Sequence, residues 1–405
     1  MTKKSDAPAI RFKGFSDAWE QRKLGELALF NPKDELPQTF EYVDLESVVG
    51  TEMLSHRTEV KSSAPSRAQR LAHTGDLFYQ TVRPYQKNNY LYEKPDNNYV
   101  FSTGYAQMRP YVDGYFLLSL VQSERFVKVV LDNCTGTSYP AINANDLAEI
   151  EVAAPSDESE AQKIGTIFRS IDNLITLHQR KFEKLTNVKK SMLEKMFPQN
   201  GSSYPEIRFK GFTDPWEQRK LGEMGQTYTG LSGKTKDDFG HGQARFVTYM
   251  NVFSNPISNP EMTEPIEIDP KQNEVEVGDV FFTTSSETPE EVGMSSILLE
   301  KRGKTYLNSF CFGFRPSEKI DSYYLAYMLR SESTRAKIIL LAQGISRYNI
   351  SKNKVMEIAV SLPSLDEQKL IGQYFSQLDN LITLHQRELE KLQNIKKSML
   401  EKMFV

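Results

Sequence analysis

A 26-residue segment occurs twice in this chain of 405 residues, and it constrains the fold more than any other feature. The first copy, DNLITLHQRKFEKLTNVKKSMLEKMF, covers residues 172–197, and the second, DNLITLHQRELEKLQNIKKSMLEKMF, covers residues 379–404, with 22 of 26 positions identical. A second pair precedes it: IRFKGFSDAWEQRKLGE at residues 10–26 and IRFKGFTDPWEQRKLGE at residues 207–223. A period of about 200 residues is too long for a solenoid, so it indicates a duplicated domain followed each time by a helix.

Each copy of the segment predicts the later part of a long amphipathic helix. Asp157–Glu160 and Ser364–Glu367 have the form of a capping box just after a proline, where a helix begins. Apolar residues then recur at alternating spacings of three and four, which is the pattern of a coiled-coil seam. The predicted seam residues are Ile171, Ile175, His178, Phe182 and Leu185 in the first helix and Leu378, Ile382, His385, Leu389 and Leu392 in the second.

Two seams in one chain most simply bury each other as an antiparallel pair, and a dimerisation coil is the alternative. His178 and His385 occupy matching positions, and we expect them to set the register of the seam rather than to act in catalysis. The repetition itself suggests two identical partner molecules that bind the chain at two matching places.

We expect an α+β fold in which two mixed globular domains are separated by two long helices that form an antiparallel coiled coil with pseudo-twofold symmetry. The expected segments are a first domain with its entry segment at 1–155, a central helix at 156–197, a linker at 198–206, a second domain at 207–363 and a C-terminal helix at 364–405. Within the domains, Asp76–Thr81, Tyr99–Arg109 and Asp279–Thr284 predict strands, and Gly114–Leu131 and Tyr323–Gln343 predict helices.

The composition is that of an ordinary soluble protein, with 39% hydrophobic and 25% charged residues. The longest apolar run, Ile338–Ala342, is too short to cross a membrane, and no apolar signal-peptide region follows the N-terminus. Cys134 and Cys311 do not occupy equivalent positions, which is typical of unpaired thiols in a cytoplasmic protein. We therefore expect a cytoplasmic protein without a membrane partner.

The sequence does not match the motifs of the catalytic sites that we considered. GLSGKT at residues 230–235 resembles a phosphate-binding loop, but Tyr228 stands where the first glycine should be. The five histidines have no spacing that would bind a metal. The chain lacks the N-P-P-[YF] and D-P-P-[YF] motifs of amino-methyltransferases, an F-x-G-x-G loop, a P-D…E-x-K nuclease motif and a G-x-S-x-G elbow. We assign no catalytic, cofactor-binding or metal-binding residue, and the sequence favours binding over catalysis.

Two pairs of loops carry the side chains best suited to read DNA bases. Arginine and lysine bind guanine, and asparagine and glutamine bind adenine, through base edges in the major groove. The net charge of −3 requires such contacts to be local, and the acidic segment 261–279 should face away from phosphates. The predicted DNA-binding residues are Arg83, Tyr85, Gln86, Lys87, Asn88, Asn89, Thr137, Ser138 and Tyr139 in the first half and Thr284, Ser285, Ser286, Ser346, Arg347, Tyr348 and Asn349 in the second.

This layout resembles the specificity (S) subunit of type I restriction–modification enzymes over essentially the whole chain. The resemblance rests on the WEQRKLGE entry segments, the GD-[LV]-F strands, the G-x-S loops followed by Pro-Ser, and above all the LITLHQR…KKSMLEKMF helices. Glu367-Gln368 keeps the usual start of the helix, whereas Glu160-Ala161 departs from it.

The resemblance implies two target recognition domains that each read one half of a split double-stranded DNA site, with the helices fixing the gap between the halves. It implies two modification (M) subunits, which transfer methyl from S-adenosylmethionine to adenine N6, and two restriction (R) subunits, which use ATP and Mg. No cofactor is then expected in this chain. The alternatives are a coiled-coil scaffold with two protein-binding domains and a self-contained DNA methyltransferase or nuclease. Salt-dependent affinity for DNA would separate the first alternative from a DNA reader.

Overall fold

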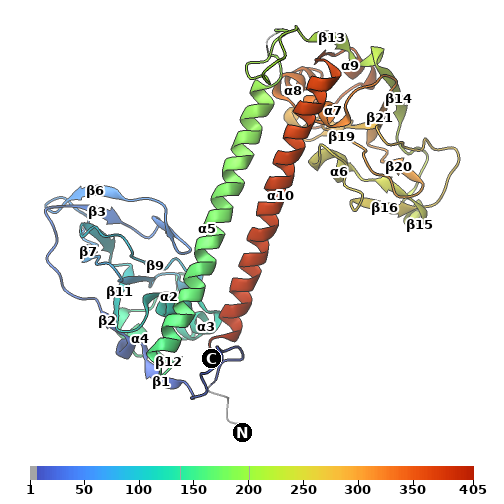
Figure 1. Cartoon of the computed structure of the whole chain (residues 1–405). Helices are drawn as coiled ribbons and strands as arrows, with labels where there is room; N and C mark the ends of the chain where they lie inside the picture. Colours follow the sequence, from blue (N-terminus) through green and yellow to red (C-terminus); the bar gives the residue numbers. More distant parts are fainter. Residues whose placement is uncertain (1–6, 137, 200) are drawn as a thin grey trace. The chain divides into compact units, whose positions relative to one another are not determined.

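The computed structural model describes residues 7–136, 138–199 and 201–405 and divides the chain into two compact units. Unit 1 contains residues 1–179 and 386–405, and unit 2 contains residues 180–385. The helix α5 (Glu158–Lys195) begins in unit 1 and ends in unit 2, and α10 (Leu365–Lys402) begins in unit 2 and ends in unit 1 (Figure 1). Each unit therefore contains the start of one long helix and the end of the other.

Unit 1 has two four-stranded sheets, a two-stranded pair that closes the domain, a small hairpin and short helices. Its strands are β1 (Glu20–Lys23), β2 (Ala28–Phe30), β3 (Thr39–Val43), β4 (Val48–Val49), β5 (Glu52–Met53), β6 (Arg57–Val60), β7 (Ala68–Leu71), β8 (Leu77–Gln80), β9 (Tyr90–Leu91), β10 (Tyr99–Ser102), β11 (Tyr105–Pro110) and β12 (Glu151–Ala154). Its short helices are α1 (Leu24–Leu27), η1 (Pro84–Gln86), α2 (Gly114–Gln122), α3 (Glu124–Asp132) and α4 (Ala144–Ala148).

Unit 2 repeats this plan with different loops. Its strands are β13 (Glu217–Lys220), β14 (Gly225–Thr229), β15 (Phe239–Val247), β16 (Thr263–Ile266), β17 (Val280–Thr283), β18 (Ser285–Ser286), β19 (Ser295–Ile297), β20 (Thr305–Leu307), β21 (Cys311–Pro316), β22 (Tyr348–Asn349) and β23 (Ala359–Leu362). Its short helices are η2 (Leu221–Glu223), η3 (Lys236–Asp238), α6 (Tyr249–Ser254), η4 (Pro289–Glu291), α7 (Ser322–Met328), α8 (Glu332–Ile339) and α9 (Lys352–Met356).

The sheet topology confirms that the two units are copies of one fold. The order β2-β11-β8-β9 in unit 1 matches β14-β21-β17-β19 in unit 2, and both sheets are antiparallel. Each second sheet contains one parallel pair, β3 with β10 and β15 with β20. The entry strands β1 and β13 pair with β12 and β23, the strands that precede the long helices. The predicted α+β class with two mixed domains is therefore confirmed.

Three predicted elements are each divided in two. Tyr99–Arg109 forms β10 and β11, which belong to different sheets. Gly114–Leu131 breaks at Ser123, whose hydroxyl accepts the N–H of Phe126 at 3.2 Å and so begins α3. Tyr323–Gln343 breaks before Ser331, which has an extended backbone conformation ahead of α8. The apolar pattern runs through all three breaks, so hydrophobicity alone could not show them.

The residues at the end of each long helix pack into the core of the unit in which the other long helix begins. In unit 1, the ring of Phe404 lies within 6.2 Å of the rings of Trp19, Phe116 and Phe168, measured between centroids. In unit 2, Phe197 packs in the same way against Trp216, Tyr324 and Phe375. These aromatic clusters belong to the main cores of their units.

Buried ion pairs fix the start of each long helix. The carboxylate of Glu160 accepts two hydrogen bonds from the Arg11 guanidinium, at 2.6 and 2.7 Å, and Glu367 accepts the same pair from Arg208 at 2.7 and 2.8 Å. The predicted capping boxes are thus only half right, because these glutamates bind the entry segment instead of the helix backbone. The N-terminal half of the box is present in Asp157, which accepts the N–H of Ser159 at 2.8 Å.

The helices run antiparallel within each unit, with the predicted seam between them. Ile171 and Leu378 are buried, and the other eight predicted seam residues are half-buried. Lys189 and Lys396, which interrupt the apolar pattern, form ion pairs with Asp379 in unit 2 and Asp172 in unit 1. The duplication therefore supplies two equivalent charged contacts inside the seam. Within the described residues, no helix is long and apolar enough to cross a membrane.

Candidate nucleic-acid interface

In unit 1, the two loops predicted to contact DNA meet at Thr81. The Thr81 carbonyl accepts the N–H of Ile142 at 3.0 Å, just after a hairpin closed by reciprocal backbone bonds between Thr135 and Ala141. The N–H and hydroxyl of Thr81 both donate to the carbonyl of Gly104, at 3.0 and 2.8 Å, in the turn between β10 and β11. We refer to this threonine, the turn and the hairpin together as the loop frame.

A basic and an aromatic side chain join the two loops on the surface of unit 1. The guanidinium of Arg83 lies 4.5 Å from the centroid of the Tyr139 ring, and the Arg83 N–H donates to the Pro140 carbonyl at 2.8 Å. Ser138 and Tyr139 are exposed, and Thr137 lies outside the described residues. The predicted loops thus form one surface that combines a cation with aromatic area, two kinds of group that nucleic-acid contacts use.

Of the remaining residues predicted to bind DNA in the first loop, some are exposed and others bind the protein itself. Tyr85 and Gln86 are exposed on η1, and Lys87 forms an ion pair with Glu124 at 2.7 Å. Asn89 is only 1% exposed, and its Oδ1 accepts the backbone N–H of Gln80 at 2.9 Å. This burial corrects its assignment as a base contact: Asn89 stabilises the loop from inside. Its neighbour Asn88 accepts a backbone hydrogen bond from the β4–β5 hairpin.

Unit 2 has the same loop frame, built on Thr284. The Thr284 carbonyl accepts the N–H of Ile350 at 3.0 Å, and its N–H and hydroxyl both donate to the Phe310 carbonyl at 2.9 Å. Residues 343–349 form the hairpin, through reciprocal backbone bonds between Gln343 and Asn349. Backbone contacts that are equivalent in the two units therefore hold loops of unrelated sequence.

The predicted DNA-binding residues of unit 2 also include both exposed and buried side chains. Ser346, Arg347 and Asn349 are exposed, and Tyr348 is half-buried. Ser285 and Ser286 are buried, because β18 pairs with β22 in the register Ser285 with Asn349 and Ser286 with Tyr348. Their burial corrects the prediction that they contact bases, as it does for Asn89. Thr284 is half-buried, with its hydroxyl bound to the frame.

The acidic loop of unit 2 is fixed through its backbone. The Arg335 guanidinium donates to the carbonyls of Glu290, Val292 and Gly293 at 2.7–2.8 Å. Burial lowers the pKa of Arg335 to about 10, which still leaves it protonated at neutral pH. The Glu287 and Glu290 side chains remain exposed. Arg335 therefore holds the loop in place through its backbone and does not neutralise its glutamate side chains.

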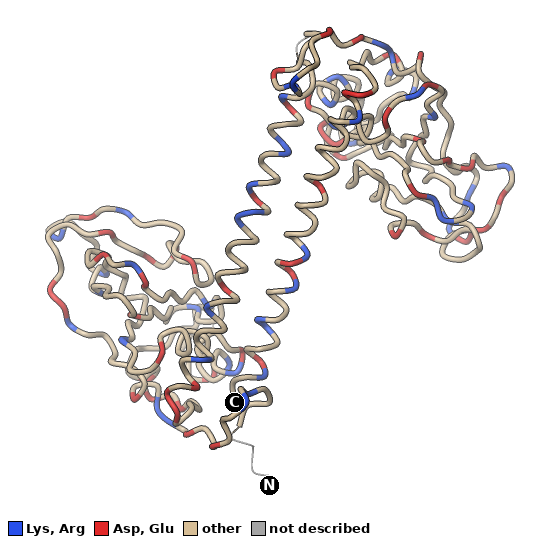
Figure 2. Tube along the Cα trace, viewed as in Figure 1, with Lys and Arg blue, Asp and Glu red and all other residues tan. Residues whose placement is uncertain are grey.

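Local ion pairs neutralise much of the acidic segment 261–279. Asp269 binds Lys234 at 2.9 Å, Glu274 binds Lys301 at 2.7 Å, and Arg302 binds Glu261 at 2.5 Å. Figure 2 shows acidic and basic residues interspersed in the same region. Lys234 belongs to the GLSGKT stretch, so the lysine of that apparent phosphate loop has a structural partner.

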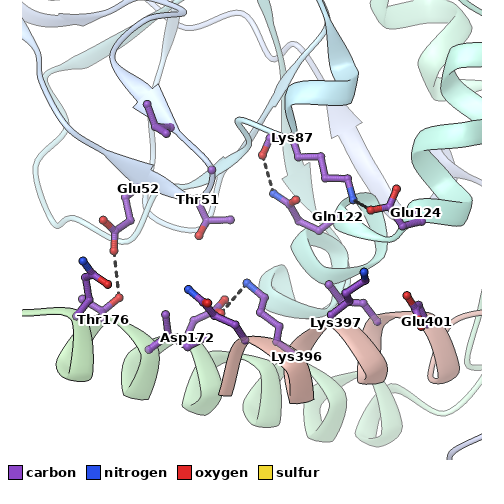
Figure 3. A pocket seen from close by; sticks show the side chains of 16 residues that line it. Thr51, Glu52, Lys87, Gln122, Glu124, Asp172, Thr176, Lys396, Lys397 and Glu401 are labelled. Carbon is purple, nitrogen blue, oxygen red and sulfur yellow. Dashed lines mark hydrogen bonds and ion pairs between the residues drawn. The ribbon is translucent and has the colours of Figure 1, made fainter. Parts of the chain in front are cut away.

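A cavity of about 530 Å³ lies in unit 1 between the β4–β5 hairpin, Lys87 of the first loop, and the long helices (Figure 3). The hydroxyl of Thr176 on α5 donates to Glu52 at 3.1 Å, and Lys396 on α10 binds Asp172 at 2.6 Å. At the hairpin tip, the Gly50 N–H donates to the Asn88 side chain at 2.8 Å. The hairpin thus connects the first loop to α5 as a strut.

We expect Gly50→Ala to loosen this strut, at a cost of about 1–2 kcal/mol, because Gly50 has a φ of 61° that a residue with a Cβ adopts poorly. No atom of the described residues lies within 4 Å of the added Cβ, so the cost comes from the backbone alone. Hydrogen exchange of the amides at 83–89 measures the effect. Gly50→Asn is the control, because asparagine tolerates this conformation. Equal exchange in the two variants would contradict the prediction.

Metal ligands do not gather anywhere in residues 7–136, 138–199 and 201–405: no group of three or more His, Cys, Asp or Glu side chains is placed to bind an ion.

Comparison with known proteins decides the family. Residues 17–187 and 213–394 each match the model of the type I restriction modification DNA specificity domain. The chain belongs to this family. The type I restriction enzyme MjaVIII specificity subunit of Methanocaldococcus jannaschii is 25% identical over 304 residues, which cover 71% of this chain and 68% of that protein. The putative MjaX specificity subunit of the same organism is 25% identical over 305 residues, or 71% and 67% of the two chains.

Solved structures share the fold of this specificity-family chain. The S subunit of a type I restriction–modification system from M. genitalium has a TM-score of 0.58 and 15% identity, over 98% of this chain and 99% of that one. A chain from a structure that describes complex assembly and conformational transition of the type I R-M system has a TM-score of 0.52 and 21% identity, over 94% and 96%.

The GD motif of this specificity-family chain has a structural role in both units. Buried Asp76 accepts hydrogen bonds from Arg109 at 2.9 Å and from Gln107 at 2.7 Å. Buried Asp279 accepts equivalent bonds from Arg315 at 2.8 and 2.7 Å. In each unit this ion pair joins the two central strands of the antiparallel sheet, β8 with β11 and β17 with β21. Hydrogen bonding to Asp76 raises the pKa of Arg109.

Thr81 was not among the residues predicted from the sequence, and Thr284 was predicted as a DNA contact rather than as the residue that binds the frame turn. A signal was present: threonine follows the GD strand at residue 81 and at residue 284. The segment 61–67 was also missed, although the carbonyl of Arg67 accepts the Thr103 N–H at 2.8 Å in the turn of the frame. That contact places Arg67, which is exposed, at the turn of the frame.

Proposed function

We propose that this chain is the noncatalytic specificity subunit of a type I restriction–modification complex, in which each unit reads one half of a bipartite double-stranded DNA site. The observation that carries the proposal is the loop frame, whose backbone contacts are equivalent around Thr81 and Thr284 while the exposed side chains differ. Unit 1 presents Arg83 and Tyr139, and unit 2 presents Arg347. A site with two unlike halves needs two unlike readers on one frame.

The repeated helices suggest two copies of one partner. Leu174 and Leu177 on α5 and the matching Leu381 and Leu384 on α10 are 43–51% exposed, outside the seam. Two shallow grooves also match: one of about 550 Å³ includes Arg180, and one of about 510 Å³ includes Arg387. Each unit has one leucine pair and one groove, so each has the same kind of docking surface. We assign these surfaces to two modification subunits.

The chemistry then belongs to the partners. S-adenosylmethionine on the modification subunits supplies the methyl group for adenine N6, and ATP and Mg act on restriction subunits. This chain positions the complex through phosphate contacts and specifies the sequence through a few loop side chains.

A map of N6-methyladenine in a host that lacks the system tests this proposal. The modification subunit and this chain are expressed separately and together. We expect a new split motif, with adenines methylated in both halves, only when the two are expressed together. Methylation by this chain alone would contradict a noncatalytic role. No new motif with both proteins soluble would favour a scaffold, for which we expect no salt-dependent affinity for DNA.

Arg83→Ala is expected to relax one position in the first half of the motif and to weaken DNA binding by about 1–3 kcal/mol, because a bidentate arginine–base contact is lost. The second half of the motif should stay unchanged. The matched variant Arg347→Ala should have the reverse effect. Loss of affinity without any change in either half would assign Arg83 to phosphate instead.

Lengthening both long helices should widen the gap in the recognised site. A second LITLHQR heptad inserted after Arg180 and after Arg387 keeps the seam and both Asp–Lys pairs. Seven residues add about 10 Å of helix, or about 3 base pairs. The methylation map reads the gap directly, and inserting the heptad in α5 alone is the control, because the seam then loses its register. An unchanged gap in the double insertion would rule out a spacer role.

A further inference from the structure

The two loop frames differ in the turn that the frame threonine binds. In unit 1 this turn ends at Gly104, and in unit 2 it ends at Phe310. The carbonyls of both residues accept two hydrogen bonds from the threonine, so the two residues occupy the same place in the frame. At this position of the frame, unit 1 therefore has a glycine without a side chain, and unit 2 has a phenyl ring.

The local contacts differ at this place in the two units. A Cβ on Gly104 would lie 2.8 Å from the Cδ1 of Leu45, so a side chain at this place in unit 1 would require Leu45 to move. The Phe310 side chain is 55% exposed, and the N–H of Phe310 donates to the Asn308 side chain at 2.8 Å, which fixes the turn. An exposed ring on an anchored turn offers apolar area at little cost in conformational freedom.

The loop that follows the frame threonine of unit 2 is unsuited to contact bases or phosphates. Ser285 and Ser286 are buried, and the acidic side chains of the neighbouring loop would repel phosphates. Ile345, at the tip of the frame hairpin, is 96% exposed. The frame of unit 2 therefore presents two apolar groups, Phe310 and Ile345, in addition to the exposed Arg347 of its hairpin.

We infer that Phe310 is a specificity-determining residue that packs against the C5-methyl group of a thymine in the second half-site. The methyl group is the apolar feature of the major groove, and phenylalanine is one of the side chains that contact it. This inference rests on the proposed function, because it requires unit 2 to read DNA bases.

Deoxyuridine tests the contact, because it differs from thymidine by that methyl group alone. The complex of this chain with its modification subunit is titrated with duplexes that carry the motif from the methylation map. Each thymine of the second half-site is replaced by deoxyuridine in turn. We expect one replacement to weaken binding about four-fold, as for one buried methyl group. Phe310→Ala should weaken binding to the thymine duplex and remove the difference between the two duplexes.

Val277→Ala is the matched control. Val277 is also an exposed apolar residue of unit 2, but it precedes β17, whereas the frame threonine follows the other end of that strand. This variant should keep the thymine preference. Replacements in the first half-site should have the same effect on the wild type and on Phe310→Ala, which shows that unit 1 still reads its half.

Two results would overturn the inference while leaving the proposed function intact. One is a wild-type complex that methylates a bipartite motif but tolerates every deoxyuridine in the second half. The other is a Phe310→Ala complex that keeps the thymine preference, or that loses affinity equally for all duplexes, as expected of a nonspecific wedge between bases. A wild-type complex without any bipartite motif would instead contradict the proposed function itself.

Discussion

Phe404→Ala is expected to lower the free energy of unfolding of unit 1 by about 3–5 kcal/mol, the usual cost of removing a buried phenylalanine. Phe404 is 5% exposed, and its ring contacts aromatic rings from the entry segment, α2 and α5. Its loss would leave a cavity among large rings that cannot close around a methyl group. The effect should be confined to unit 1, although α10 begins in unit 2.

Hydrogen exchange measured under mild denaturant tests this confinement. Amides of α2 and α3 report on unit 1, and those of α7 and α8 report on unit 2. The matched variant Phe197→Ala should destabilise unit 2 and spare unit 1, because Phe197 has the same position in that core. Equal loosening of both units by either variant would contradict the assignment of each helix end to one core.

Glu160→Gln is expected to cost unit 1 about 3 kcal/mol, the lower end of the range for breaking a buried ion pair. The carboxylate of Glu160 is fully buried, and it accepts both hydrogen bonds from Arg11 and one from the Trp19 indole at 3.2 Å. Glutamine keeps the size but removes the charge, which leaves Arg11 without its counterion. The side chain of Arg11 retains some contact with water, which limits the loss.

Glu367→Gln in unit 2 is the matched variant, and its expected cost is smaller. Its partner Arg208 has the same geometry, but among the described residues the indole nitrogen of Trp216 has no hydrogen-bond partner, so Glu367 accepts one bond fewer than Glu160. Urea unfolding, followed by hydrogen exchange in each unit, compares the two variants. A larger loss in Glu367→Gln than in Glu160→Gln would show that the Trp19 bond does not contribute.

The fold was largely predictable where local patterns determine it. The duplicated segment and its spacings of three and four predict α5 and α10, because an apolar stripe with this period is stable only as a helix buried along one side. The strands after each GD pair were also predictable, because continuous apolar residues end there at a turn. The breaks at Ser123 and Ser331 were not predicted, because the apolar pattern continues through both of them and does not show where the backbone leaves the helical conformation.

The candidate site was predictable only in outline. The sequence indicates the loops, and the structure joins them through Thr81, which was not predicted, and Thr284, which was predicted as a DNA contact rather than as a backbone anchor. Asn89, Ser285 and Ser286 have the side chains of base readers, yet all three are buried. Residue type shows what a side chain can bind, whereas its burial depends on backbone pairing with distant segments such as β22.

The sequence by itself determined that there are two copies of one domain, each with a long helix and its own set of loops. Only the tertiary structure decided that the end of each helix completes the other unit's core, and that Lys189 and Lys396 lie opposite aspartates. The two 26-residue segments are nearly identical, so any pairing of their seams satisfies the same local pattern. The contacts of Phe197 with unit 2 and of Phe404 with unit 1 distinguish between these pairings, and these contacts join residues that are far apart in the chain.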